Sequence, residues 1–283
     1  MALWPFARLR GVDIVWDAFL SLYDTVVEDR KIVKPKSLAA KVLFAVEWLS
    51  CRAADRVVLE TRAHADYFEL TFGLPPKRMA VVHVGVEAQF IRPCPMPPAP
   101  RQADSSVKVL FYGQFIPLHG IETIIRAAQA AGDAPIDWTI FGSGQEERKI
   151  RELLGEHAVE RLTWVPWVGY QELNDWIHRA DVCLGIFGKS DKAARVIPNK
   201  IFQVLATGTP LITRDSPAIR ELLSPDMIGV SLVPPGDPEA LLAAVRRFVD
   251  HSPAADGIQQ DIQVLRRNRR TVVRSLQQTN RLA

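Results

Sequence analysis

The sequence is poor in cysteine and lacks the long apolar runs of secreted or membrane-spanning proteins. Only three cysteines occur among its 283 residues: Cys51, Cys94 and Cys183. Their spacing fits no metal site or disulfide framework, so we expect reduced thiols in a cytoplasm. The first ten residues have no continuous apolar core of the kind that signal peptides carry. The most apolar helix candidate, residues 37–54, contains three charged side chains, so it is not expected to span a bilayer.

The sequence also has no large excess of positive or negative charge and no cluster of metal-binding histidines. The net charge of +3 is too small to indicate a nucleic-acid partner. The six histidines are scattered without the spacing of a metal-binding helix, so neither a metal nor another cofactor is expected. Hydrophobic residues make up 48% of the chain, which is typical of a globular protein with a sizeable core.

What the sequence does contain is an alternation of strand-like and helix-like segments. Residues 107–250 are predicted to form a complete Rossmann-like α/β domain, because short links between the segments favour a parallel sheet. Residues 1–92 are predicted to form only a partial Rossmann-like domain with a bare sheet edge. Its three strands are expected at residues 13–16, 56–60 and 79–84. A proline-rich linker is predicted at residues 93–106.

The last segment, residues 251–283, combines a partial helical stripe of apolar residues with several arginines. We interpret it as an amphipathic helix. Two alternatives stay open for its arginines: they lie in solvent while the helix packs on its own protein, or they contact anionic lipid on the inner face of a membrane. A nucleic-acid surface is not expected, because no aromatic stacking platform accompanies them.

The most informative segment is residues 196–210. Pro198 fits the first position of a helix, and Gly208 fits the left-handed residue just past its end. Lys200 then lies in the first turn, where a cation opposes the positive end of the helix dipole. The placement is favourable if an anion binds there, because free N–H groups and a lysine together form a phosphate site. The alternative is a solvated surface lysine.

Glycines follow two of the predicted strands directly. Gly113 ends the strand at residues 108–112, while Gly142 and Gly144 follow the strand at 137–141. Ligands of parallel α/β sheets bind outside the carboxyl ends of the strands, and a residue without a side chain lets a ligand approach the backbone. A plain strand-to-helix turn is the alternative at each position.

Taken together, these segments resemble a known family. Residues 113–123, 141–144, 180–182 and 198–210 occur in the order found in the nucleotide-sugar-binding domain of family 4 (group 1) retaining glycosyltransferases with the GT-B fold. Residues 17–24, 54–61 and 82–86 resemble the second half of that family's N-terminal domain. The resemblance implies that the first half of this domain is missing. A wrong start, a split or decayed gene, or a partner chain that supplies the strands would each account for this.

The resemblance implies a function. A member moves a sugar from a nucleotide-sugar donor to a saccharide or lipid-linked acceptor, with retention and without a metal, in polysaccharide or glycan synthesis. A non-catalytic nucleotide-sugar-binding or partner subunit is the alternative. No catalytic residue is identified. The donor-binding residues that the resemblance implies are Gly113, Gln114, His119, Gly142, Gly144, Arg195, Asn199, Lys200 and Gln203.

The chain departs from the family at four of these positions. Many members carry arginine and lysine in the turn where this chain has Gln114 and His119. We expect His119 to donate a hydrogen bond to phosphate or sugar, more strongly if it is protonated; the alternative is an ordinary loop histidine. The paired glutamates of many members fall at Arg195 and Gln203. Gln203 keeps an acceptor oxygen for ribose but loses the charge, whereas Arg195 reverses the charge and is suited to face phosphate.

Two carboxylates are candidates for the acceptor side of the site. Asp17 and Asp24 follow the first predicted strand, near the expected cleft between the two domains. Either contacts an acceptor or caps local structure.

Overall fold

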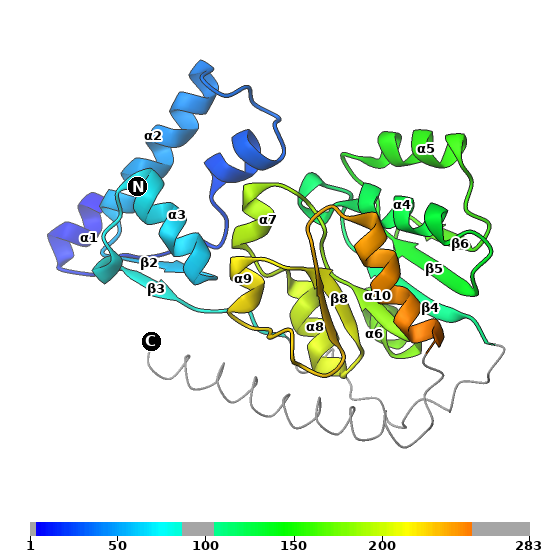
Figure 1. Ribbon diagram of the computed structural model, residues 1–283. Helices are drawn as coiled ribbons and strands as arrows, with labels where there is room; N and C mark the ends of the chain where they lie inside the picture. The colour runs from blue at the N-terminus through cyan, green and yellow to red at the C-terminus, as the bar shows by residue number, and fades with distance from the viewer. Residues whose placement is uncertain (1–3, 87–104, 251–283) are drawn as a thin grey trace.

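The computed structural model describes residues 4–86 and 105–250, which form two lobes (Figure 1). Residues 4–86, the N-lobe, contain a parallel sheet in the order β1-β2-β3. Residues 105–250, the C-lobe, contain a six-stranded parallel sheet in the order β6-β5-β4-β7-β8-β9. The predicted α/β class with parallel sheets is therefore confirmed. The predicted linker and the predicted C-terminal helix lie largely outside the described residues.

The C-lobe sheet is doubly wound. Its strands are β4 (Val107–Tyr112), β5 (Ile136–Phe141), β6 (Leu162–Val165), β7 (Val182–Leu184), β8 (Leu211–Arg214) and β9 (Val230–Val233). From β4 the chain moves outward to β5 and β6, then returns to β7 on the other side of β4. The strand order therefore reverses beside β4, and the carboxyl ends of β4 and β7 border the crevice where such sheets bind ligands.

Helices cover both faces of this sheet. On one face α4 (Ile121–Ala131), α5 (Glu147–Glu156) and α10 (Pro238–Asp250) share an apolar core with the strands. On the other face α6 (Tyr170–Arg179), α8 (Asn199–Thr207) and α9 (Pro217–Arg220) form a second core. The central strands β4, β7 and β8 are thus buried on both faces, which is why they are largely apolar in the sequence, whereas the edge strand β6 is only partly covered.

The N-lobe is smaller. Its strands are β1 (Val15–Asp17), β2 (Arg56–Leu59) and β3 (Met79–Val81), and its helices are α1 (Trp4–Arg10), η1 (Asp24–Asp29), α2 (Leu38–Ala53), α3 (Arg62–Phe72) and η2 (Pro76–Arg78). Phe68 and Phe72 of α3 pack on Leu59 of β2 in its core. Ser37 and Thr61 cap α2 and α3 by accepting hydrogen bonds from backbone N–H groups of the first turn.

Apolar side chains on the N-lobe are unusually exposed. Fifteen of the eighteen large hydrophobic residues that are exposed among the described residues lie between Trp4 and Leu70. Leu38, Val42 and Leu49 form one stripe along α2, and their exposed fractions are 79%, 53% and 43%. Strand β1 pairs with β2 on one side, and no other described strand pairs with it. The N-lobe therefore has an open sheet edge, as the sequence predicts.

Several predicted element boundaries are wrong. Pro198 is the residue before α8 with an extended backbone, not the first helical residue, so the helix begins at Asn199. Three helices were not predicted from the sequence: α1, η1 and the short α7 (Asp191–Arg195), whose N-cap is Ser190. Among the described residues, none of the helices is both long enough and apolar enough to cross a bilayer.

Candidate functional site

The predicted glycines meet at the carboxyl ends of β4 and β5. Gly113, Gly142 and Gly144 have φ angles of +144°, +148° and +149°, which strongly favour glycine. A Cβ on Gly142 would overlap the carbonyl oxygen of Gly113, and one on Gly144 would lie 2.9 Å from the carbonyl oxygen of Phe115. The turns after β4 and β5 therefore pack directly against each other. This contact by itself accounts for Gly142 and Gly144.

Lys200, in the first turn of α8, is buried beneath the turn that follows β4. Its exposed fraction is 5%, and its Nζ has no hydrogen-bond partner. The Nζ lies 3.9 Å from the centre of the Phe111 ring and would be 2.9 Å from a Cβ on Gly113. Burial holds the pKa of Lys200 well below its usual value. The alternative of a solvated surface lysine is therefore wrong.

His119 lies at the end of a single 3-10 turn, η3 (Pro117–His119), and folds back over Gly113. Its Nδ1–H donates to the carbonyl oxygen of Gln114, so only Nε2 remains as an acceptor. Burial and the nearby Lys200 hold the pKa of His119 well below its usual value. The imidazole is therefore neutral and its N–H is used locally, and the expected hydrogen bond from His119 to phosphate or sugar stays a prediction.

Arg195 turns away from the predicted phosphate position and toward the N-lobe. Its Nη2 lies 2.8 Å from Oδ1 of Asp24 and 3.6 Å from Oε2 of Glu28, and its guanidinium covers the ring of Tyr67 at 4.2 Å. The backbone carbonyl of Arg195 accepts a hydrogen bond from Oγ1 of Thr61. Both ends of this residue are therefore held by the N-lobe, and its guanidinium does not face α8.

The two acceptor-side candidates have different surroundings. Asp24 is 1% exposed and is committed to Arg195, so it lies in the contact between the lobes and not on an open acceptor surface. Burial raises the pKa of Asp24 to about 6, against the attraction of Arg195 and Lys192. Asp17, at the end of β1, is exposed.

The remaining donor-side candidates lie around the start of α8 and the end of β6. Nε2 of Gln203 donates to the hydroxyl of Tyr170, over 3.0 Å. Asn199 is the first residue of α8. Trp167 and Tyr170, in and just after the loop that follows β6, are 77% and 45% exposed. Neither aromatic residue was predicted as a site residue, although both closely follow the strand predicted at residues 161–165.

Gln114 contacts a residue of the N-lobe that lies far from it in the sequence. Nη2 of Arg30, directly after η1 in the N-lobe, lies 3.4 Å from Oε1 of Gln114. No local pattern connects two residues that are 84 positions apart, so sequence reasoning had no signal for this contact.

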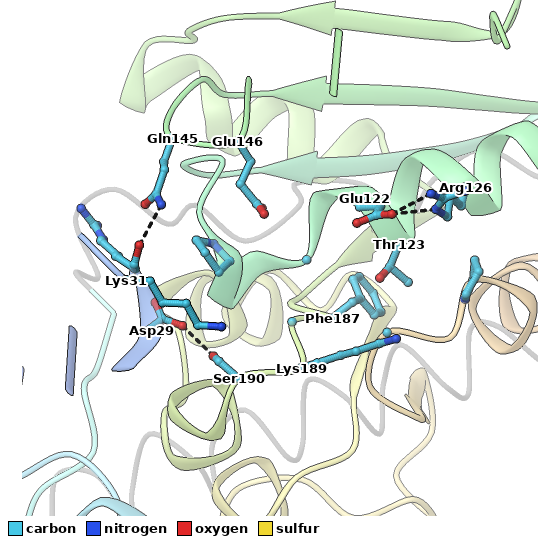
Figure 2. A pocket seen from close by; sticks show the side chains of 16 residues that line it. Asp29, Lys31, Glu122, Thr123, Arg126, Gln145, Glu146, Phe187, Lys189 and Ser190 are labelled. Carbon is cyan, nitrogen blue, oxygen red and sulfur yellow. Dashed lines mark hydrogen bonds and ion pairs between the residues drawn. The ribbon is translucent and has the colours of Figure 1, made fainter. Parts of the chain in front are cut away.

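A cavity of about 670 Å³ lies between the lobes (Figure 2). Residues 29–31 of the N-lobe form one wall, and the start of α4, the loop after β5 and the loop after β7 form the others. Lys31 and Glu146 point into it from opposite sides. None of the nine predicted donor-binding residues lines this cavity. It is therefore adjacent to the predicted donor site, across the turn at residues 114–120, and not identical with it.

No group of three or more side chains able to hold a metal occurs within residues 4–86 and 105–250. Whether a metal takes part in the chemistry stays a prediction.

Known proteins share this architecture. At the level of sequence, the chain is 28% identical over 229 residues to D-inositol 3-phosphate glycosyltransferase of Streptomyces griseus, covering 70% of this chain and 47% of that protein. It is 25% identical over 146 residues to a putative colanic acid biosynthesis glycosyl transferase, WcaI, of Escherichia coli K12, covering 51% and 36%. The chain therefore spans about half the length, or less, of these curated relatives.

Solved structures agree with this likeness. Sucrose-phosphate synthase from Thermosynechococcus elongatus superimposes with a TM-score of 0.68 at 18% identity, covering 99% of this chain and 72% of that one. Anabaena HepE, solved in complex with UDP and glucose, superimposes with a TM-score of 0.71 at 13% identity, covering 98% and 71%. At such identities the likeness establishes the fold, which is that of the GT-B glycosyltransferases.

The family described as glycosyl transferases group 1 matches residues 106–251. This match spans more than half of the chain and coincides with the C-lobe, where the glycine turns, α8 and Lys200 lie. The chain therefore belongs to the group 1 glycosyltransferases.

Proposed function

We propose that this chain binds a nucleotide-sugar donor and transfers its sugar, with retention, to a saccharide or lipid-linked acceptor. The observation that carries the proposal is Lys200, a buried amine without a hydrogen-bond partner at the start of α8. A buried polar group without a partner costs about 1–3 kcal/mol of stability. A lysine in this position is explained if a bound anion completes its surroundings.

Transfer of the sugar leaves negative charge on the departing diphosphate. Catalysis then depends on donors and cations that are already in place where this charge develops. The start of α8 supplies N–H groups, and Lys200 supplies a cation once an anion raises its pKa again. Gly113 supports this arrangement, because its missing side chain leaves Lys200 Nζ next to the turn after β4.

Trp167 and Tyr170 suit the nucleobase end of the donor. Both are exposed aromatic residues beside the carboxyl end of β6. Stacking on such a side chain is worth about 1–3 kcal/mol per base. A uridine nucleotide is supported by the complex of the similar Anabaena HepE with UDP and glucose.

A non-catalytic nucleotide-sugar-binding or partner subunit is the second candidate. Two observations favour it. Arg195 is tied to Asp24 of the N-lobe, so it is not available for the sugar. Gln203 replaces a charged acceptor and bonds to Tyr170. A subunit of this kind binds the donor but does not turn it over.

Titration calorimetry with UDP, followed by a donor screen with mass-spectrometric detection of products, tests the proposal. UDP binding with transfer or hydrolysis of a donor sugar supports the enzyme, and NMR of the first-formed product reports whether the anomeric configuration is retained. UDP binding without turnover supports the subunit. If no nucleoside diphosphate binds, both functions are wrong.

The proposal also covers where the protein acts and which partner it binds. It acts in the cytoplasm, on the inner face of a membrane when the acceptor is lipid-linked. A partner chain adds strands to the open edge of β1. Flotation with anionic vesicles and co-purification test these two points separately.

A further inference from the structure

Arg30 links the two lobes at the turn that follows β4. Its Nη2 lies 3.4 Å from Oε1 of Gln114. Its Nε is buried and has no hydrogen-bond partner. The ion pairs formed within residues 4–86 and 105–250 do not include Arg30. A guanidinium without an ion-pair partner and with an unpaired N–H group can still bind an anion.

The turn after β4 carries few cations that could bind a phosphate. Gln114 carries no charge, and burial above all, with a smaller contribution from Arg30, holds the pKa of His119 well below its usual value. Lys200 itself is buried beneath the turn. Arg30 is thus the cation that contacts the turn from the opposite lobe.

The backbone around Arg30 is fixed in place. Nε2 of Gln145, in the loop after β5, donates to the carbonyl oxygen of Arg30 over 2.9 Å. Ser190, in the loop after β7, donates to Asp29 over 2.6 Å. Both bonds are drawn in Figure 2. Lys31 has a φ angle of +52°, a conformation that residues other than glycine adopt only when their surroundings impose it.

The loops after β5 and β7 of the C-lobe therefore fix the position of residues 29–31 of the N-lobe. A cation held in this way needs little reorganisation when charge develops beside it, which is the condition for effective electrostatic stabilisation.

We propose that Arg30 is a phosphate-binding residue of the nucleotide-sugar site, contributed by the N-lobe. This inference rests on the proposed function. The guanidinium donates N–H groups to the diphosphate oxygens while the bond between the sugar and the diphosphate breaks and its electron pair stays on the diphosphate. Arg30 transfers no proton. The donor site is then complete only while the lobes are in contact.

The test compares Arg30→Gln with the wild-type chain in calorimetric titrations of UDP, UMP and uridine. Glutamine removes the charge but can still donate to Gln114. We expect affinity for UDP to fall about tenfold, the loss typical of a hydrogen bond to a charged group. Affinity for uridine, which has no phosphate, stays the same, and UMP shows a smaller loss than UDP. Arg30→Lys recovers part of the UDP affinity.

Lys34→Gln is the matched control, because it removes the same charge from an exposed lysine four residues further along the same loop. It leaves UDP affinity unchanged. If Arg30→Gln binds UDP as tightly as the wild-type chain, or loses UDP and uridine equally, the inference is wrong. Lys200→Met separates the role of Arg30 from the existence of the donor site. If it abolishes UDP binding while Arg30→Gln does not weaken it, the donor site stands and the role of Arg30 falls. If the wild-type chain binds no UDP, the proposed function falls and takes the inference with it.

Discussion

Arg195 of α7 and Asp24 of η1 form an ion pair across the two lobes, with Nη2 2.8 Å from Oδ1 and side-chain exposures of 17% and 1%. Arg195 lies four residues before the start of α8. The contact between the lobes therefore also fixes the chain that leads into the candidate donor site. Thr61 strengthens this link by bonding to the carbonyl oxygen of Arg195.

Removing Arg195 should destabilise the protein in a pH-dependent way. At pH 8 we expect Arg195→Met to lower the free energy of unfolding by about 3 kcal/mol, because a buried carboxylate loses its partner. Asp24, which also faces Lys192 and Glu28, has its pKa raised to about 6 by burial. The loss should therefore shrink as the pH falls through this value and the carboxyl group becomes neutral.

Urea unfolding at pH 8 and pH 5 measures this effect. Adding Asp24→Asn to Arg195→Met should restore most of the stability at pH 8, since the uncompensated charge is then gone. Equal destabilisation at both pH values would show that Arg195 acts through packing on Tyr67 alone.

Lys200→Met should change stability and binding in opposite directions. Methionine has a similar shape, and it removes a buried amine that has no hydrogen-bond partner. We expect the melting temperature to rise, because the unpaired polar group is gone. The free energy of UDP binding should weaken by about 1.5–3 kcal/mol, the range for a hydrogen bond to a charged group. Calorimetry and thermal unfolding on the same sample check both signs, and an unchanged affinity would remove Lys200 from the donor site.

Glu60, the residue after β2, should lower the free energy of unfolding as the pH rises. Burial raises its pKa from 4.5 to about 8, so the folded protein keeps the proton between these values while the unfolded chain releases it. Folding stability therefore declines over this window. Glu60→Gln lacks this titration, so at pH 8 its free energy of unfolding should exceed that of the wild-type chain by about 4 kcal/mol, with little difference near pH 4.

Denaturant unfolding across this pH range tests Glu60→Gln. A stability difference that does not vary with pH would mean that Glu60 is ionised in the folded protein. His64 also makes stability depend on pH, but with the opposite sign and at lower pH, so it does not account for a loss of stability as the pH rises. Its pKa is lowered to about 3 by burial, so it contributes stability that is lost only as the pH falls below about 6.5.

The exposed stripe on α2 and the open edge of β1 should cause self-association. We expect sedimentation velocity of the 283-residue chain to show species larger than the monomer that grow with concentration. Leu38→Glu combined with Val42→Glu should reduce these species, because both side chains are exposed on α2. Ile228→Glu, at an exposed position of the C-lobe, is the control that leaves them unchanged. A compact monomer at all concentrations would show that this surface is tolerated in water.

Local sequence signals were enough to predict much of the C-lobe. The strands that end at Gly113 and Gly142 and the helix that ends at Gly208 follow from apolar runs and from glycines with positive φ angles. These signals act within a few residues, so they can be read without the fold. Short elements escaped the same reasoning. A helix of five residues such as α7 leaves too little periodicity to recognise.

By itself, the sequence determined the α/β class, the parallel sheet of residues 107–250 and the presence of a lysine at the start of α8. Only the tertiary structure decided what the charged groups do. It buried Lys200 without a partner, made His119 neutral and placed Arg30 against Gln114. The physical reason is that charge interactions and desolvation depend on distances through space, between residues that lie as far apart in the chain as Asp24 and Arg195, whereas the patterns that fix secondary structure are local.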